Sequence, residues 1–96
     1  MKSFTLYQSY PNPAVVENHS ITISYELPKA GAIDIRIFDN GGKLVRQVLH
    51  SLQDPGAHKI LWDGKDDNGK YPAAGLYFYQ VQFGNDILTK KLILIK

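Results

Sequence analysis

The chain has 96 residues, 44% of them hydrophobic and 11% aromatic, and its formal net charge at pH 7 is +2. This length fits one domain with a thin core, which leaves little room for a deep substrate cavity. The 11 lysine and arginine residues do not cluster, so nucleic-acid binding is not expected, and no long apolar run indicates membrane insertion. Because the chain has no cysteine, disulfides, thiolate metal sites and cysteine nucleophiles are excluded.

Hydrophobic residues recur with a period of two along most of the chain from residue 21 onward. In the first such run Ile21, Ile23, Tyr25 and Leu27 alternate with polar residues, which is typical of a half-buried strand. Segments rich in glycine, proline, asparagine and aspartate separate this run from those that follow. The predicted strands cover residues 21–27, 33–37, 43–49, 58–62, 77–83 and 87–95.

A further short edge strand is expected near the N-terminus, between residues 6 and 10. No window combines helical spacing with capping residues, and no internal repeat is visible. About six or seven short strands with regular turn signals predict an all-β fold, an Ig-like or fibronectin-like antiparallel β-sandwich. We assign residues 1–5 to an N-terminal linker and residues 6–96 to the sandwich.

The polar loop between residues 63 and 75 is the strongest candidate for a metal site. Calcium prefers several carboxylate and carbonyl oxygens that lie close together in the sequence. An EF-hand loop starting at Asp63 needs an oxygen ligand at its third position and glutamate at its twelfth, where Lys65 and Ala74 stand. Asx-type turns between two strands are therefore the favoured interpretation, and no cofactor is expected. The calcium candidates are Asp63, Asp66, Asp67 and Asn68.

No pattern in the sequence indicates catalysis, and we expect a domain without enzymatic activity. His19, His50 and His58 are far apart, lack the paired spacing of metal ligands and have no nucleophile motif beside them. An exposed Trp62 could stack on sugars, as in carbohydrate-binding modules. Because apolar Ile60 lies two residues earlier on the same face of the predicted strand, we expect Trp62 in the core.

Several short motifs follow one another in a fixed order along the chain. Residues 6–13 read Leu-Tyr-Gln-Ser-Tyr-Pro-Asn-Pro and residues 21–28 read Ile-Thr-Ile-Ser-Tyr-Glu-Leu-Pro. The later motifs are residues 37–45, 62–69, 74–79 and 90–94. In content and order they resemble the type A C-terminal sorting domains of the type IX secretion system in Bacteroidetes. The resemblance extends over about residues 6–96, nearly the whole chain.

Two loops depart from the pattern of the sorting family. Ala14 stands where the family often has phenylalanine, and Asn40-Gly41-Gly42 replaces a hydrophobic residue followed by glycine. The motifs at residues 62–69 and 74–77 are also similar to the Ig-like module of flagellar hook-capping proteins, a structural and assembly element. That module lacks the Tyr-Pro-Asn-Pro opening, which favours the sorting family.

The resemblance implies a secretion signal and no chemistry of the domain's own. In the sorting family the parent protein crosses into the periplasm, where the outer-membrane translocon recognises its terminal sandwich. A sortase-like transpeptidase then removes the domain and releases the parent protein or anchors it at the cell surface. The recognition residues that the resemblance implies are Pro11, Asn12, Pro13, Gly75, Tyr77, Lys90, Lys91, Leu92 and Leu94.

The last predicted strand ends in residues 92–95, which are apolar on both faces and need cover from the sandwich or from a partner. Such a strand can be read by strand addition or as an apolar patch, or it can simply complete the sandwich. Self-association through this strand stays open. The alternative functions are an Ig-like structural or adhesion module and a carbohydrate-binding module of a secreted bacterial protein.

Overall fold

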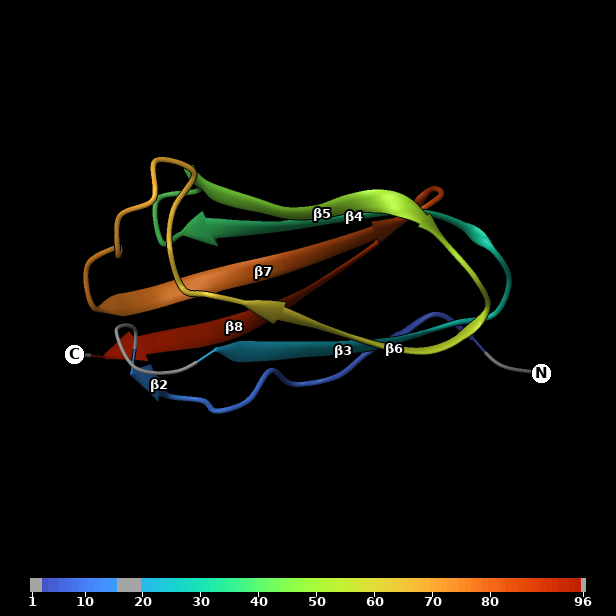
Figure 1. Ribbon diagram of the computed structural model, residues 1–96, viewed down its shortest axis with the longest axis horizontal. Helices are drawn as coiled ribbons and strands as arrows, with labels where there is room; N and C mark the ends of the chain where they lie inside the picture. Colours follow the sequence, from blue (N-terminus) through green and yellow to red (C-terminus); the bar gives the residue numbers. More distant parts are fainter. Residues whose placement is uncertain (1–2, 16–19, 96) are drawn as a thin grey trace.

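The computed structural model describes residues 3–15 and 20–95, and among these it contains strands and no helix (Figure 1). Within this part of the chain there is accordingly no helix with the length and apolar character needed to cross a bilayer. The strands are β1 (Thr5–Leu6), β2 (Ala14–Val15), β3 (Ile21–Leu27), β4 (Gly31–Asp39), β5 (Leu44–Gln53), β6 (Gly56–Trp62), β7 (Gly75–Phe83) and β8 (Asp86–Ile95).

These strands form two sheets, a small one in the order β1-β3-β6 and a large one in the order β2-β8-β7-β4-β5. Neighbouring strands are antiparallel except for β2, which runs parallel to the end of β8 with Ala14 opposite Leu94. Side chains from both sheets form one core, so the predicted all-β sandwich is confirmed.

The six long strands, β3 to β8, lie where the hydrophobic alternation predicts them, although several are longer than expected. The N-terminal part differs from the prediction of one edge strand at residues 6–10. It forms β1, an isolated bridge between Tyr10 and Thr22, and β2, which the sequence did not indicate. Ordered contacts also begin before residue 6, because Thr5 pairs with Glu26 and the ring of Phe4 lies 5.5 Å from that of Phe83.

The core follows directly from the period of two. In β3 the apolar residues at alternate positions are buried and the residues between them are half-buried. The same alternation in β4 and β7 buries Ile35 and Val81, which lie opposite each other on these neighbouring strands. Burial of each such side chain contributes about 1.5–3 kcal/mol. Trp62 is 1% exposed, which confirms the prediction that it belongs to the core.

Candidate functional site

The residues implied in recognition come from both ends of the chain, and the fold brings these ends together. The segment of residues 7–15, called here the N-terminal segment, runs beside β3 and reaches the outer edge of β8 at residues 91–95 (Figure 1). The Asn12 side chain accepts a hydrogen bond at Oδ1 from the backbone N–H of Ile93, with N···O 2.9 Å. Gln8 donates from Nε2 to the backbone carbonyl of Lys91 at 3.0 Å. Strand β2 then continues the cover by pairing with the last residues of β8.

The last strand therefore does not present a free edge over residues 91–95. Two side chains and a short parallel strand satisfy backbone groups that an edge strand leaves open. Strand addition at this part of β8 requires displacement of the N-terminal segment. The Tyr-Pro-Asn-Pro motif thus has a local structural role, because its asparagine replaces a strand partner of β8.

Tyr79 fixes the N-terminal segment from inside the core. Its hydroxyl donates to the backbone carbonyl of Tyr7 and accepts from the backbone N–H of Ser9, both at 2.8 Å. Burial raises the pKa of Tyr79, and its hydrogen bonds with Ser9 partly oppose that rise. No functional role was predicted for Tyr79, although a tyrosine at an inward position of a strand usually finds a polar partner for its hydroxyl.

Gly75 and Tyr77 lie at the start of β7, directly beside β8. Gly75 has φ +152°, a backbone conformation that favours glycine, and is in register with Leu94. Tyr77 is in register with Leu92, and its hydroxyl donates to the backbone carbonyl of Ala73 at 2.6 Å. Burial, followed by the nearby charge of Asp39, raises the pKa of Tyr77. Both residues shape the margin of the sandwich where the two chain ends meet.

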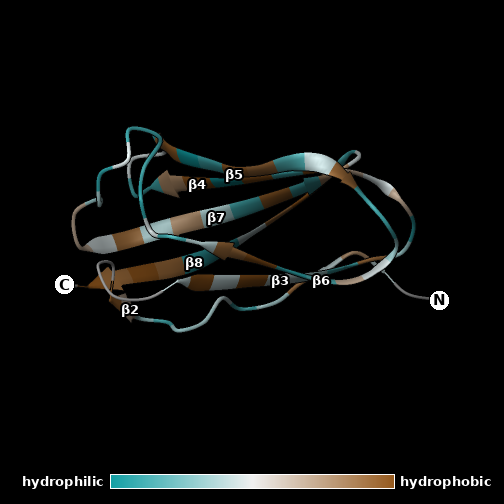
Figure 2. Ribbon diagram, viewed as in Figure 1, coloured by the Kyte–Doolittle hydropathy of each residue, from teal (hydrophilic) through white to brown (hydrophobic). Residues whose placement is uncertain are grey.

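The two faces of β8 differ in what they offer to a partner. Leu92 and Leu94 are fully buried, so they complete the core and cannot be contacted directly. On the opposite face, Ile93 is 41% and Ile95 40% exposed. Lys91, two residues before Ile93, is exposed on this face as well. On the same face, Leu76 and Phe78 of β7 are in register with Ile93 and Lys91. Figure 2 shows the end of β8 as hydrophobic. We call Leu76, Phe78, Lys91, Ile93 and Ile95 together the outer patch.

The loop that joins β4 to β5 is held by the aspartate at its start. Asp39 accepts at Oδ1 from the backbone N–H of Gly41 at 2.9 Å and of Lys43 at 2.8 Å. The backbone of Gly42 donates to the carbonyl of Asp39, and that of Asp39 to the carbonyl of Lys43. Gly42 has φ +87°, which explains a glycine at this position.

Residues 66–70 repeat this arrangement in the aspartate-rich loop. Asp66 accepts at Oδ1 from the backbone N–H of Asn68 and of Lys70, each at 2.9 Å, and Gly69 has φ +80°. The five-residue sequences Asp-Asn-Gly-Gly-Lys and Asp-Asp-Asn-Gly-Lys thus fold alike. This short repeat was not predicted, although the Asp-x-x-Gly-Lys spacing that both loops share indicates it.

The hydrogen bonds of the aspartate-rich loop are those of Asx-type turns, the interpretation that the sequence favoured. Arg46 of β5 lies against the loop, with its guanidinium 3.6 Å from Asp63 and 3.7 Å from Asp67, and donates to the carbonyls of Lys65 and Asp66. Among the described residues, no three acidic or histidine side chains converge as a metal site would require. The carboxylates of Asp63 and Asp66 thus accept hydrogen bonds that fold the loop, and the guanidinium of Arg46 lies beside those of Asp63 and Asp67.

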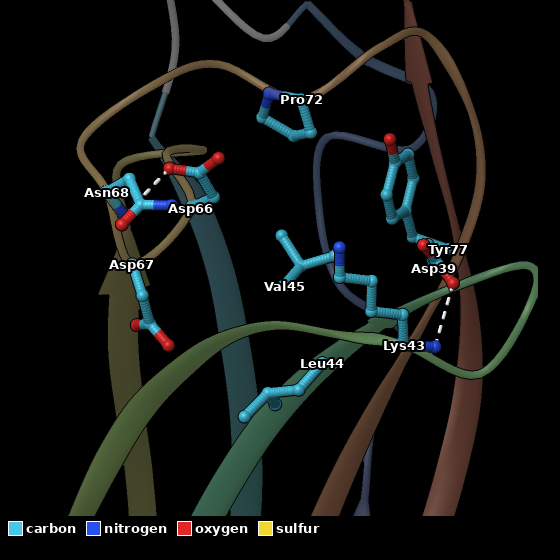
Figure 3. A pocket seen from close by; sticks show the side chains of 9 residues that line it. All are labelled: Asp39, Lys43, Leu44, Val45, Asp66, Asp67, Asn68, Pro72 and Tyr77. Carbon is cyan, nitrogen blue, oxygen red and sulfur yellow. Dashed lines mark hydrogen bonds between the residues drawn. The ribbon is translucent and has the colours of Figure 1, made fainter.

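The two similar loops flank a shallow pocket of about 230 Å³ (Figure 3). Asp39 and Lys43 line it from one loop and Asp66 and Asn68 from the other, and Tyr77 lies beside Asp39. Figure 3 shows both aspartates turned toward the backbone of their own loops. The polar groups of the pocket thus stabilise turns, and they do not converge on a common point in the way that a nucleophile and its base do.

Trp62 cannot stack on a sugar in the way the carbohydrate-binding alternative requires. Its ring is buried, and its indole N–H donates to the carbonyl of Lys65 at 2.9 Å. Of the histidines, His58 stacks on Tyr25 with ring centroids 5.4 Å apart, and His50 lies 3.8 Å from Asp34. His19 lies outside the described residues.

Comparison with known proteins shows that this fold occurs in an Ig-like domain family and in several solved structures. The profile of the FlgD Ig-like domain matches residues 14–86 of the chain. PorU of Porphyromonas gingivalis, described as dimeric and latent, superposes with a TM-score of 0.73 at 22% identity, over 96% of this chain and 9% of PorU. PorZ of the same organism, described as an essential surface component of the type IX secretion system, superposes with a TM-score of 0.65 at 21% identity, over 95% of this chain and 11% of PorZ.

FlgD from P. aeruginosa also has this fold, with a TM-score of 0.64 at 26% identity, over 82% of this chain and 62% of that structure. The chain spans about one tenth of PorU and of PorZ, and less than two thirds of FlgD. No match was found among curated proteins. The likeness to PorU and PorZ shows a shared fold that includes the N-terminal segment and β8, beyond the limits of the family profile.

Proposed function

This chain belongs to the FlgD Ig-like domain family, and from that premise we propose that it is a C-terminal sorting domain of type IX secretion. In this role it performs no catalysis and is recognised as a folded unit by the outer-membrane translocon. A sortase-like transpeptidase then cleaves it from the parent protein, which is released or anchored at the cell surface. The domain passes through the periplasm in transit and is afterwards secreted or located at the cell surface.

The observation that carries this proposal is the joint surface built by the two ends of the chain. The 76 residues 14–89 separate the Tyr-Pro-Asn-Pro motif from the Lys-Lys-Leu-Ile-Leu motif, and the side chains of Asn12 and of the preceding Gln8 bond to the second motif. Most of this joint surface lies outside the profile match at residues 14–86. PorZ, which shares the fold at 95% coverage of this chain, is itself a surface component of a type IX system.

The sharpest test uses the outer patch. Deletion of residues 90–96 removes Leu92 and Leu94 from the core, so a failure of export after deletion cannot separate recognition from folding. We therefore fuse residues 1–96 to a reporter in a type IX-competent strain and substitute Ile93→Asp, an exposed position. Leu61→Asp on β6, which is 67% exposed, is the matched control. The proposal predicts that the unmodified fusion and the Leu61→Asp variant are exported and that the Ile93→Asp variant stays in the periplasm.

Retention of the unmodified fusion in the periplasm contradicts the proposal. If all three fusions are exported equally, the domain is a sorting signal but the outer patch is not the part that is read. Circular dichroism of each purified domain checks that the variants remain folded.

The second candidate function is an Ig-like structural module, which the likeness to FlgD over 82% of the chain favours. The two functions differ in the fate of the domain. A sorting signal is cleaved off, so peptides from residues 3–95 are absent from the mature surface protein, whereas a structural module is retained. Mass spectrometry of the mature protein decides between them.

A further inference from the structure

One margin of the large sheet lies beyond the reach of the small sheet. None of the ten residues of β5 is fully buried, whereas three isoleucines of the neighbouring β4 are 0% exposed. Val45, Val48 and Leu49 of β5 pack against the core but stay partly exposed. In Figure 1 β5 lies at the margin opposite β8, away from β3 and β6. A strand added beside β6 would extend the small sheet toward β5 and cover these side chains.

The backbone of β6 is free to accept such a strand. On the other side of β3, Tyr7 donates to the carbonyl of Ser24, and Tyr10 and Thr22 exchange two backbone bonds. In an antiparallel ladder both backbone groups of a residue point to the same side, so the intervening residues of β3 face β6. The register Ile23↔Ile60 then directs the even-numbered residues of β6 toward β3.

Ala57, Lys59 and Leu61 therefore point their backbone N–H and C=O groups outward. No hydrogen bond from the described residues reaches these groups. Their side chains are exposed as well, and Leu61 is 67% exposed. A strand edge of this kind is a template for main-chain pairing.

The other sheet edges in the described part of the chain are short, irregular or partly covered. Strand β1 is two residues long, and the N-terminal segment covers the end of β8. Strand β5 has two register shifts against β4, and Asp67 bonds to the backbone of Val45 and of Gln47 at its edge. Short strands, irregularities and cover are the devices by which edges avoid pairing, and the seven-residue β6 carries neither a proline nor a bulge.

We infer that the outer edge of β6 binds an extended peptide strand of alternating apolar residues that carries an acidic residue opposite Lys59. In an antiparallel pair, directly opposed residues share one face, so the residue paired with Lys59 lies on the outer face and a carboxylate there is attracted by the ammonium group. The residues on either side of it point inward, toward Ile60 and the partly exposed valines of β5. Main-chain bonds provide affinity, and this alternation provides specificity.

A second copy of the chain fits this edge less well. In the fully overlapping antiparallel register of two β6 strands, the central residue of Gly56–Trp62 is Lys59, so the two lysines would lie directly opposite each other. Like charges in that position destabilise the pair. The charge at the centre of β6 thus selects against self-pairing and in favour of an acidic strand. Binding at this edge does not depend on the sorting role.

The test uses the whole chain, labelled with ¹⁵N, and a capped peptide Thr-Val-Thr-Val-Glu-Val-Thr-Val-Thr. The expected result is chemical-shift change and slower hydrogen exchange at the amides of Ala57, Lys59 and Leu61. A matched peptide with lysine in place of glutamate is expected to bind about fivefold more weakly. Lys59→Glu is expected to invert this ranking, whereas Lys70→Glu, the same change at an exposed position of the aspartate-rich loop, leaves it unaltered.

Several results overturn the inference. Peptide-induced shifts that map to β5 or β8, no binding up to the solubility limit of the peptide, or an unchanged ranking in Lys59→Glu each contradict it. Protection of the three amides that grows with protein concentration, without peptide, shows that a second copy occupies the edge instead. Because export is not measured, failure of this binding leaves the proposed sorting function untouched.

Discussion

Along the β8 margin of the sandwich the N-terminal segment covers the terminal strand, whereas along the β6 margin the backbone of the edge strand faces solvent. The covered margin uses side chains in place of a strand, because Asn12 and Gln8 each bond to one backbone group of β8. The open margin has no such segment among the described residues. The same sandwich therefore has one edge that is closed to strand pairing and one that allows it.

A tyrosine hydroxyl ties each margin, but to different partners. Tyr79 bonds to two backbone groups of the N-terminal segment, whereas Tyr25 of β3 donates to the side chain of Gln53 at the end of β5 at 2.5 Å. The backbone groups that bond to Tyr79 are held by the fold of the chain. The side chain of Gln53 must also lose rotamer freedom to bond to Tyr25. The difference predicts that the β8 margin is the more rigid of the two.

The largest expected effect is removal of a buried side chain from the covered margin. Leu94→Ala leaves a cavity at a position that is 0% exposed, and we expect a loss of about 2–5 kcal/mol in the free energy of unfolding. Ile95→Ala, one residue further on the exposed face, is the control and should cost much less. Urea denaturation of both variants measures the difference. Equal losses would mean that β8 does not bury its alternate residues as described.

Alkaline pH should weaken the open margin through Tyr25. Burial raises the pKa of Tyr25 from 10.0 to about 12 in the folded chain. The unfolded chain therefore loses this proton first as the pH rises, so stability that is complete below pH 10 is lost between pH 10 and about 12. The loss attributable to this shift is about 2–3 kcal/mol.

Denaturation of the parent chain and of Tyr25→Phe at about pH 9 and about pH 11.5 isolates this effect. The phenylalanine variant should lose less stability over that interval, because it lacks the ionisable group. An identical pH dependence of the two chains would show that Tyr25 does not titrate differently on folding.

Tyr79→Phe breaks the internal tie of the covered margin. It removes the hydroxyl that accepts from the buried N–H of Ser9, which should cost about 1–3 kcal/mol. Unfolding free energy is measured, together with hydrogen exchange at Ser9. If the amide of Ser9 stays as protected as in the parent chain, the N-terminal segment is held by other contacts.

Asn12→Ala removes one bond at the exposed edge and should cost about 0.5–1.5 kcal/mol. The specific readout is the amide of Ile93, which donates to Asn12 and should exchange faster in the variant. Asn40→Ala, in the exposed turn between β4 and β5, is the matched control. A variant in which the exchange of the Ile93 amide is unchanged contradicts the role of Asn12 as a substitute strand partner.

The smallest effect is expected on the open margin. Leu61→Thr changes a side chain that is 67% exposed, and the free energy of unfolding should change by no more than about 0.5 kcal/mol. Thermal denaturation measures it. A markedly larger loss would mean that something already covers β6 in solution.

Much of the fold could be predicted because the pattern is local. The alternation of Ile21, Ile23, Tyr25 and Leu27 marks β3 without knowledge of its neighbours, and Trp62 follows the same rule. Strand β2 could not be predicted, since two residues show no period and their partner is the distant end of β8. For the site, the motif residues were identified by resemblance, but the roles of Gln8, Tyr79 and Arg46 depend on partners far away in the sequence.

The two-sheet β-sandwich could be predicted from the amino-acid pattern alone, because side-chain periodicity and turn residues act over only a few positions. Three features become visible only in the folded chain: Asn12 covers the edge of β8, Arg46 lies against the aspartate-rich loop, and the outer edge of β6 is open. These features depend on which distant segments become neighbours. Strand order and register settle that, and neither is encoded by any single stretch of residues.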